Sequence, residues 1–87
     1  MDKYYVYILL ASDNKLYVGY STNLKARYEL HTKGYVKSTK HRRPLKLIHY
    51  EYFISRKDAK AREVYLKSGA GHKQIYSFMK NTLETKD

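Results

Sequence analysis

The stretch YYVYILLASDNKLYVG, residues 4–19, constrains the fold more than any other part of the chain. Two segments rich in β-branched and aromatic residues, Tyr4–Ala11 and Leu16–Tyr20, flank the polar sequence Ser12–Lys15. Strands favour such residues, and a short polar segment between two strands is typical of a turn. The chain is therefore predicted to begin with a β-hairpin.

Side-chain alternation divides the hairpin residues between two faces, because successive side chains of a strand point to opposite sides of the sheet. One face would carry the aliphatic residues Val6, Ile8, Leu10, Leu16 and Val18. The other would carry Tyr5, Tyr7, Leu9, Tyr17 and Gly19. A one-residue slip in the pairing would exchange the faces of one strand, so the length of the connection matters.

The separation of Tyr7 and Tyr17 depends on the same connection. A three-residue loop, Asp13–Lys15, would offset the two tyrosines by four residues, roughly 13 Å along the strands, and a longer or bulged connection would bring them closer. Two interpretations of the tyrosines stay open: cross-strand packing, worth ~0.2–1 kcal/mol per pair, and a chemical role. Gly19 either marks the close approach of another group or relieves crowding before the next element.

The rest of the chain predicts helices and one more strand. We expect a helix over 24–33, which Ser21, Thr22 or Asn23 caps and Gly34 ends, and then an exposed basic connection over 33–46. A strand over 45–54 and a capped helix over 56–67 should follow. After a break at Ser68–Gly71, we expect a helix over 72–83 and a frayed tail over 84–87. Together they predict one α+β domain over residues 1–83, a small antiparallel sheet with helices packed on it. The aromatic residues Tyr28, Tyr50, Tyr52, Phe53 and Phe78 are expected in its core rather than as stacking platforms.

The charge of the chain makes nucleic acid the first partner to consider. Lys and Arg number 18 against 8 Asp and Glu, a net charge of +10 in 87 residues, and such a charge attracts polyanions. A merely soluble basic protein is the alternative.

The absence of cysteine excludes disulfides and thiolate metal sites and agrees with a cytoplasmic location. No apolar run approaches the ~20 residues that span a membrane, so no membrane association is expected.

Three further residues carry candidate chemistry. Arg27 and His31 are four residues apart and would project from one face of the first helix, close to the end of the second strand. Glu63 lies in the middle of the 56–67 helix. Simpler interpretations exist: Arg27 and His31 as a solvated basic face, and Glu63 as a surface ion pair with Lys60 or Lys67, worth only ~0.3–0.5 kcal/mol.

The order of these features resembles that of the GIY-YIG nuclease family. Tyr5-Val6-Tyr7 matches the first triplet of the family and Tyr17-Val18-Gly19 the second, with nine residues between Tyr7 and Tyr17. A helix with Arg and then His, a basic stretch and a helix with a central Glu follow. The similarity covers nearly the whole chain. It is greatest to small single-domain bacterial members (UPF0213-like), with a further likeness to the N-terminal nuclease domain of the excinuclease C subunit.

This resemblance implies a three-stranded antiparallel sheet flanked by helices and metal-dependent cleavage of phosphodiesters. By similarity, the site residues are the motif tyrosines Tyr7 and Tyr17, the helix arginine Arg27, His31 as a residue that helps to activate the nucleophile, and Glu63 as the protein ligand of a single Mg²⁺ or Mn²⁺ ion. The chain departs from the family pattern in three ways. Tyr5 replaces a glycine, valine replaces isoleucine in both triplets, and the asparagine that some members carry after the metal glutamate has no counterpart.

The identity of the general base follows less directly from these residues. A tyrosine phenolate at neutral pH requires nearby positive charge, because the ordinary pKa of tyrosine is about 10. Histidine is better matched to pH 7. His31 could accept a proton through Tyr7 or Tyr17, or it could orient the water directly, and we expect a relay that involves both tyrosine and histidine.

Substrate contacts are expected from the basic connection, at Lys37, Thr39, Lys40, Arg42 and Arg43. Contacts of this kind bind phosphate and carry no sequence information. The expected function is a structure-selective or nonspecific endonuclease of DNA repair, acting on DNA rather than RNA as a monomer, with nucleic-acid shape or a partner protein supplying specificity. A non-catalytic DNA- or RNA-binding module with the same fold, or a protein-interaction domain, is the alternative.

Overall fold

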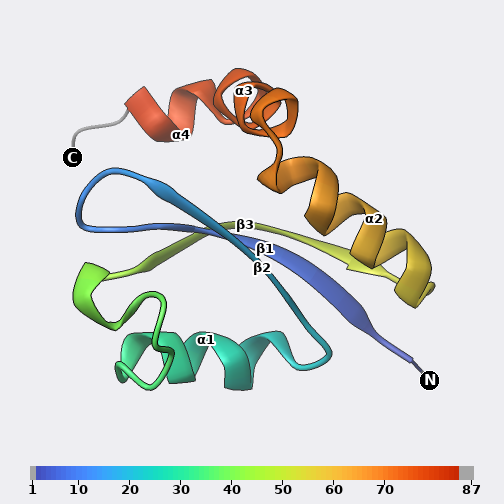
Figure 1. The fold of residues 1–87 in the computed structure, drawn as a ribbon, viewed down its shortest axis with the longest axis horizontal. Helices are drawn as coiled ribbons and strands as arrows, with labels where there is room; N and C mark the ends of the chain where they lie inside the picture. The colour runs from blue at the N-terminus through green and yellow to red at the C-terminus, as the bar shows by residue number, and fades with distance from the viewer. Residues whose placement is uncertain (1, 85–87) are drawn as a thin grey trace.

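A computed structural model describes residues 2–84 of the chain (Figure 1). Three strands form one antiparallel sheet in the order β2-β1-β3: β1 (Tyr4–Leu10), β2 (Leu16–Ser21) and β3 (Lys46–Phe53). The helical elements are α1 (Leu24–Thr32), a short 3₁₀ helix η1 (Lys40–Arg42), α2 (Arg56–Lys67), α3 (Gly69–Phe78) and α4 (Lys80–Glu84). Helix α1 lies on one side of the sheet, and α2 and α3 lie on the other. The predicted α+β fold, a three-stranded antiparallel sheet flanked by helices, is confirmed.

The hairpin forms as predicted, but its register differs by two residues from the three-residue loop considered above. Leu10 pairs with Leu16 and Tyr7 pairs with Gly19, so residues 11–15 make the connection. Asn14 has a φ of 63°, a left-handed conformation that asparagine tolerates better than most residues. A shift of two residues leaves every side chain on its predicted face and reduces the offset between Tyr7 and Tyr17 to one diagonal pair.

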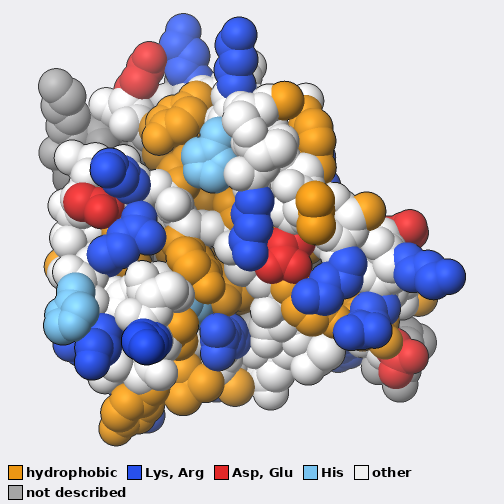
Figure 2. Space-filling model, in the orientation of Figure 1, with side chains coloured by type: hydrophobic (Ala, Val, Ile, Leu, Met, Phe, Trp, Pro, Cys, Tyr) orange, Lys and Arg blue, Asp and Glu red, His pale blue; other side chains and the backbone are white. Residues whose placement is uncertain are grey.

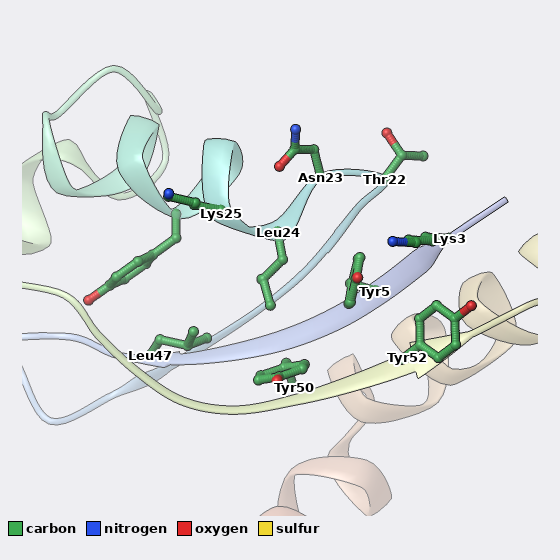
Figure 3. A pocket seen from close by; sticks show the side chains of 10 residues that line it. Lys3, Tyr5, Thr22, Asn23, Leu24, Lys25, Leu47, Tyr50 and Tyr52 are labelled. Atoms are coloured by element: carbon green, nitrogen blue, oxygen red, sulfur yellow. The ribbon is translucent and has the colours of Figure 1, made fainter. Parts of the chain in front are cut away.

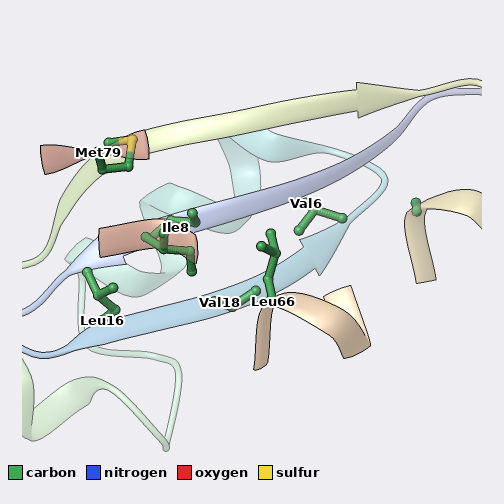
Figure 4. Packing of buried hydrophobic residues seen from close by; sticks show 8 residues of the cluster. Val6, Ile8, Leu16, Val18, Leu66 and Met79 are labelled. Atoms are coloured by element: carbon green, nitrogen blue, oxygen red, sulfur yellow. The ribbon is translucent and has the colours of Figure 1, made fainter. Parts of the chain in front are cut away.

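The two faces of the sheet are buried against different helices. On one face, the predicted aliphatic set packs with residues of α2 and α3 and with the residue that follows α3 (Figure 4): Val6, Ile8, Leu16, Val18, Ala59, Leu66, Ile75 and Met79. On the opposite face, Tyr7 and Leu9 pack with Ala11 and Leu45 and with side chains from α1. Tyr7 is therefore anchored on the α1 side of the sheet.

Helix α1 is capped at both ends. Asn23, one of the three predicted capping residues, accepts a hydrogen bond from the backbone N–H of Ala26 through Oδ1, at 3.1 Å. Gly34 adopts a φ of 81° and donates to the carbonyl of His31, while Tyr35 donates to that of Leu30. These two bonds form the Schellman motif that glycine favours. They fix the turn of α1 that carries His31.

The prediction for the C-terminal helices was correct for α2 and wrong for the single helix over 72–83, which starts earlier and is divided at Met79 into α3 and α4. Helix α2 has the predicted bounds, and Ser55 caps it. Ser68 then caps α3, which begins at Gly69 rather than at residue 72. A Cβ on Gly71 would lie 1.9 Å from the carbonyl oxygen of Tyr65, so this glycine lets α3 start directly against the end of α2. Glu84 ends α4, and the rest of the predicted tail lies outside the described residues.

The basic connection was predicted to be exposed, and this prediction was wrong for part of it. Val36, Thr39 and Leu45 are buried. The carbonyl of Arg42 accepts a hydrogen bond from the backbone N–H of Ser12, at 3.0 Å, so the segment packs against the hairpin connection. Apolar and hydroxyl side chains spaced among the basic residues explain this burial. Within residues 2–84, no helix has the length and apolar character needed to cross a bilayer.

Candidate active site

A chain of hydrogen bonds links Tyr7, His31 and Thr39. The Tyr7 hydroxyl lies 2.8 Å from His31 Nε2, and His31 Nδ1 lies 2.8 Å from Thr39 Oγ1. Tyr7 is 1% exposed, and the other two residues are fully buried. Both imidazole nitrogens thus have a partner, and the ring is held in one orientation between β1 and the segment before η1.

Gly19 provides the space that this arrangement needs. A Cβ built on Gly19 would lie 2.3 Å from both Cζ and the hydroxyl oxygen of Tyr7. The Tyr7 ring therefore passes directly over the backbone of β2, where any other residue would displace it. Of the two interpretations left open for Gly19, the structure supports close approach, and the approaching group is a side chain of the protein itself.

Arg27 and Tyr17 lie against the same chain of hydrogen bonds. The centroid of the Tyr17 ring is 5.2 Å from that of His31 and 6.4 Å from that of Tyr7. Arg27 lies one turn before His31 on α1 and interacts with both phenol groups. Hydrogen bonding to Tyr7 raises the pKa of the guanidinium, although burial opposes the shift. The predicted residues of β1, β2 and α1 therefore converge at one place.

Burial sets the protonation states of the central pair. It raises the pKa of the Tyr7 phenol above its ordinary value, although hydrogen bonding to Arg27 acts in the opposite direction. Burial, together with the positive charge of Arg27, lowers the pKa of His31 to about 4. At pH 7 the pair therefore consists of a neutral phenol and a neutral imidazole.

The carboxylate of Glu63 makes two ion pairs. Its Oε1 lies 3.4 Å from Lys60 Nζ and its Oε2 lies 2.9 Å from Lys67 Nζ. Both pairs considered from the sequence are present, but the Glu63 side chain is only 13% exposed, unlike an ordinary surface carboxylate. Its negative charge contributes to the raised pKa of Tyr7, so Glu63 lies within electrostatic range of the tyrosine.

Glu63 offers a single carboxylate to a metal ion, and two lysines now occupy its oxygens. In the described part of the chain, no three His, Asp or Glu side chains gather closely enough to hold a metal ion. Mg²⁺ often binds through one or two carboxylates and keeps several waters. Glu63 offers one carboxylate, and the side chains of Lys60 and Lys67 are 47% and 51% exposed, so they can turn toward solvent. The donor set therefore fits such an ion.

Four of the five residues predicted to contact phosphate lie at the surface or partly at it. Lys37 and Lys40 line a hollow of about 550 Å³ together with Tyr35. Arg43 is exposed, and Arg42 forms an ion pair with Asp13 at 3.3 Å. Basic side chains gather over η1 and the preceding segment, at the lower left of Figure 2.

Thr39 was predicted to contact phosphate and does not lie where it could. Its side chain is fully buried, and its hydroxyl is hydrogen-bonded to His31. Sequence reasoning missed this partner, because a threonine eight residues from a histidine carries no local signal of contact. The pairing arises only when the segment after α1 turns back under the helix.

Comparison with known proteins places these features in context. The GIY-YIG catalytic domain family matches residues 3–76. A UPF0213 protein of Staphylococcus haemolyticus is 46% identical over 69 residues, which cover 78% of this chain and 84% of that protein. A UPF0213 protein of Pediococcus pentosaceus is 42% identical over 82 residues, covering 93% and 86%. The solution NMR structure of a UPF0213 protein from Bacillus halodurans is similar with a TM-score of 0.58, at 33% identity, over 87% of this chain and 84% of that one.

Proposed function

The chain belongs to the GIY-YIG family, as its motifs indicated, and on this premise we propose that it is a metal-dependent endonuclease that hydrolyses phosphodiester bonds in DNA. The observation that supports the proposal most is the 2.8 Å hydrogen bond between the Tyr7 hydroxyl and His31 Nε2. It joins a residue of the first triplet to the helix histidine, beside Tyr17 and Arg27.

Activation of the nucleophile is proposed to run through Tyr7 and His31. In the required tautomer, His31 Nδ1–H donates to Thr39 and Nε2 accepts the proton of the Tyr7 hydroxyl, while the phenol oxygen takes a proton from water. A pKa of about 4 leaves the imidazole unprotonated at pH 7, but it also makes His31 a weaker base than the ordinary histidine expected from the sequence. A bound phosphodiester brings negative charge that would raise this pKa and favour the transfer.

The exposure of the side chains around Tyr7 indicates where the attacking water would lie. Tyr7 is 1% exposed, whereas Tyr17 and Arg27 are partly exposed. Water in contact with the Tyr7 hydroxyl would therefore be held away from bulk solvent and bordered by these two side chains. Electrostatic interactions are stronger in such a place than in open water. The Arg27 guanidinium would bind a non-bridging phosphate oxygen there through its fork of N–H donors.

Glu63 is proposed to hold a single Mg²⁺ or Mn²⁺ ion. When bound, the ion supplies a Lewis acid that stabilises negative charge on the leaving oxygen. Lys60 and Lys67 would release the carboxylate oxygens in exchange and remain close enough to attract the nucleic acid.

The proposed substrate is DNA, bound without sequence preference. The net charge of +10 provides the general attraction. Lys37, Lys40 and Arg43 would contact phosphates, which fixes position but does not read bases. Selectivity would come from the shape of the DNA or from a partner protein, and the setting expected for such an activity is DNA repair in the cytoplasm.

Cleavage of supercoiled plasmid and of branched DNA tests the proposal. We expect cleavage with Mg²⁺ or Mn²⁺, none with EDTA, and at least a hundredfold loss in Tyr7→Phe and Glu63→Gln. Glu29→Gln, the same chemical change at an exposed residue of α1, should cleave like the wild type. Full activity in Glu63→Gln would refute the metal-ligand assignment. Binding without any cleavage would favour the non-catalytic module instead.

A further inference from the structure

A second site lies on the α1 side of the sheet. It is a groove of about 760 Å³ lined by residues of β1, β3 and the start of α1: Lys3, Tyr5, Thr22, Asn23, Leu24, Lys25, Tyr28, Leu47, Tyr50 and Tyr52 (Figure 3). Its volume is within the range of ligand-binding sites, roughly 300–1,000 Å³. None of the roles assigned above uses this groove.

The groove exists because α1 covers only part of the sheet. The helix has nine residues and would be about 13.5 Å long. It covers Tyr7 and Leu9 but leaves the start of β1 and the end of β3 open on this face. Tyr5 pairs with Tyr52 and Tyr7 pairs with Tyr50, so these tyrosines share one face of the sheet.

The floor of the groove is aromatic and accessible. Tyr50 and Tyr52 were predicted in the core, but they are 54% and 45% exposed. The ring of Tyr5 lies between them, with centroid distances of 6.2 Å to Tyr50 and 5.6 Å to Tyr52. Exposed aromatic side chains grouped in this way are unusual on a surface without a binding role. Mutual packing of the rings limits their rotation, so they are already ordered before a ligand arrives.

The rim of the groove is basic and polar. Lys3 comes from the segment before β1 and Lys25 from the first turn of α1, and both side chains are exposed. Thr22 and Asn23 add polar groups on the same side (Figure 3). Among residues 2–84, none of the side chains that line the groove is acidic. Aromatic rings beneath ammonium groups therefore match a ligand that combines flat apolar surfaces with negative charge.

We propose that this groove binds unpaired bases of a single-stranded DNA segment. The bases stack on Tyr50, Tyr52 and Tyr5, while Lys3 and Lys25 pair with the phosphates. Stacking on aromatic rings within a basic groove is a general mode of single-strand binding. Bases within a duplex are already stacked and paired, so they cannot reach a recessed floor of this kind.

This inference rests on the proposed function, which supplies DNA as the ligand, and it specifies the unpaired segment as the part of the DNA that the groove binds. Helix α1 presents Arg27 and His31 toward Tyr17 of β2, and its Tyr28 lines the groove and donates to the carbonyl of Leu45. One helix therefore separates the tyrosine–histidine cluster from the groove. A DNA junction or flap, which joins a duplex to an unpaired strand, presents both kinds of structure within this short span.

Fluorescence anisotropy tests the inference in EDTA, where cleavage plays no part. The probes are a labelled oligothymidine of about 12 nucleotides and a blunt duplex of equal length. We expect the double variant Tyr50→Ala/Tyr52→Ala to bind the single strand at least about tenfold more weakly and the duplex within about twofold of the wild type. The double variant Tyr50→Phe/Tyr52→Phe keeps the rings and should bind normally. Tyr76→Ala, at a similarly exposed tyrosine of α3 (48%), is the matched control.

Three results would overturn the inference: unchanged single-strand binding in the alanine variant, an equal loss on the duplex, or the same loss in the phenylalanine variant. Circular dichroism checks that each variant is folded, and Lys3→Ala/Lys25→Ala offers a second test at exposed residues. That variant should weaken single-strand binding and make its salt dependence shallower. Failure of the proposed nuclease function appears separately, as absence of cleavage by the wild type with metal, and leaves this binding result standing.

Discussion

Replacement of Gly19 by alanine is the most direct test of how the site is assembled. The new Cβ would lie 2.3 Å from Cζ and the hydroxyl oxygen of Tyr7, whereas carbon atoms in contact prefer about 3.5–4.0 Å. The tyrosine ring must therefore move by about 1 Å or more. The hydrogen bond to His31 is 2.8 Å long and would not survive such a shift.

Three contributions set the size of the effect. Overpacking in a buried region costs about 1–3 kcal/mol, and a buried imidazole nitrogen without its partner costs about 1–3 kcal/mol. Alanine is favoured over glycine inside a strand by about 0.5–1 kcal/mol, which offsets part of this loss. The free energy of unfolding should therefore fall by about 1–5 kcal/mol, with a central value near 3 kcal/mol, and the proposed cleavage activity should be lost.

A double-mutant cycle with Tyr7→Leu, followed by urea unfolding, measures the coupling. Tyr7→Leu removes the atoms that the new Cβ would meet, so Gly19→Ala should be neutral or slightly stabilising in that background. The expected coupling energy is about 2 kcal/mol or more. If the effects of the two substitutions instead add within about 0.5 kcal/mol, Gly19 is not there to admit the Tyr7 ring, and the reasoning is refuted.

Three further predictions concern pH and salt. Folding lowers the pKa of His31 from 6.5 to about 4, so at pH values between these two the unfolded chain binds a proton that the folded chain does not. The free energy of unfolding should therefore be full above pH 6.5 and fall by about 3 kcal/mol as the pH falls toward 4. Urea unfolding should show a weaker pH dependence in His31→Gln, and equal dependence in the two proteins would contradict this. Burial opposes ionisation of Glu51, but hydrogen bonds from Arg62 at 2.9 and 3.1 Å help to hold its pKa below the usual value. Arg62→Ala should therefore lower stability by about 1 kcal/mol at pH 7 and by less as Glu51 becomes protonated in acid, and a constant difference would argue against the pair. Lys37→Ala/Lys40→Ala should weaken duplex binding and reduce the slope of log affinity against log salt by roughly 1.8, whereas an unchanged slope would remove these lysines from the interface.

Local sequence patterns predicted the elements that depend on neighbouring residues. Helix α2 has the predicted bounds because Ser55 is a strong capping residue and the chain after Lys67 offers a second cap at Ser68. The assignment of hairpin residues to faces was correct because it depends only on alternation, which a two-residue shift in register preserves. Both lysine partners of Glu63 followed from helical spacing.

Features that depend on distant parts of the chain could not be predicted in the same way. Sequence alone did not fix the hairpin register, because loops of three and five residues satisfy the same alternation. Burial of Thr39 requires the segment after α1 to fold back beneath His31. Tyr50 and Tyr52 are exposed because α1 is too short to cover this part of the sheet, and the composition of β3 does not reveal how far α1 extends.

The burial of the Tyr7–His31–Thr39 chain also governs how its protons exchange with solvent. Each of the three side chains is at most 1% exposed, and both hydrogen bonds are 2.8 Å long. Their labile protons are thus shielded from bulk water and should give resolved side-chain signals in NMR spectra. The imidazole signal would reveal which ring nitrogen carries the proton, so the tautomer can be read before any substrate is added.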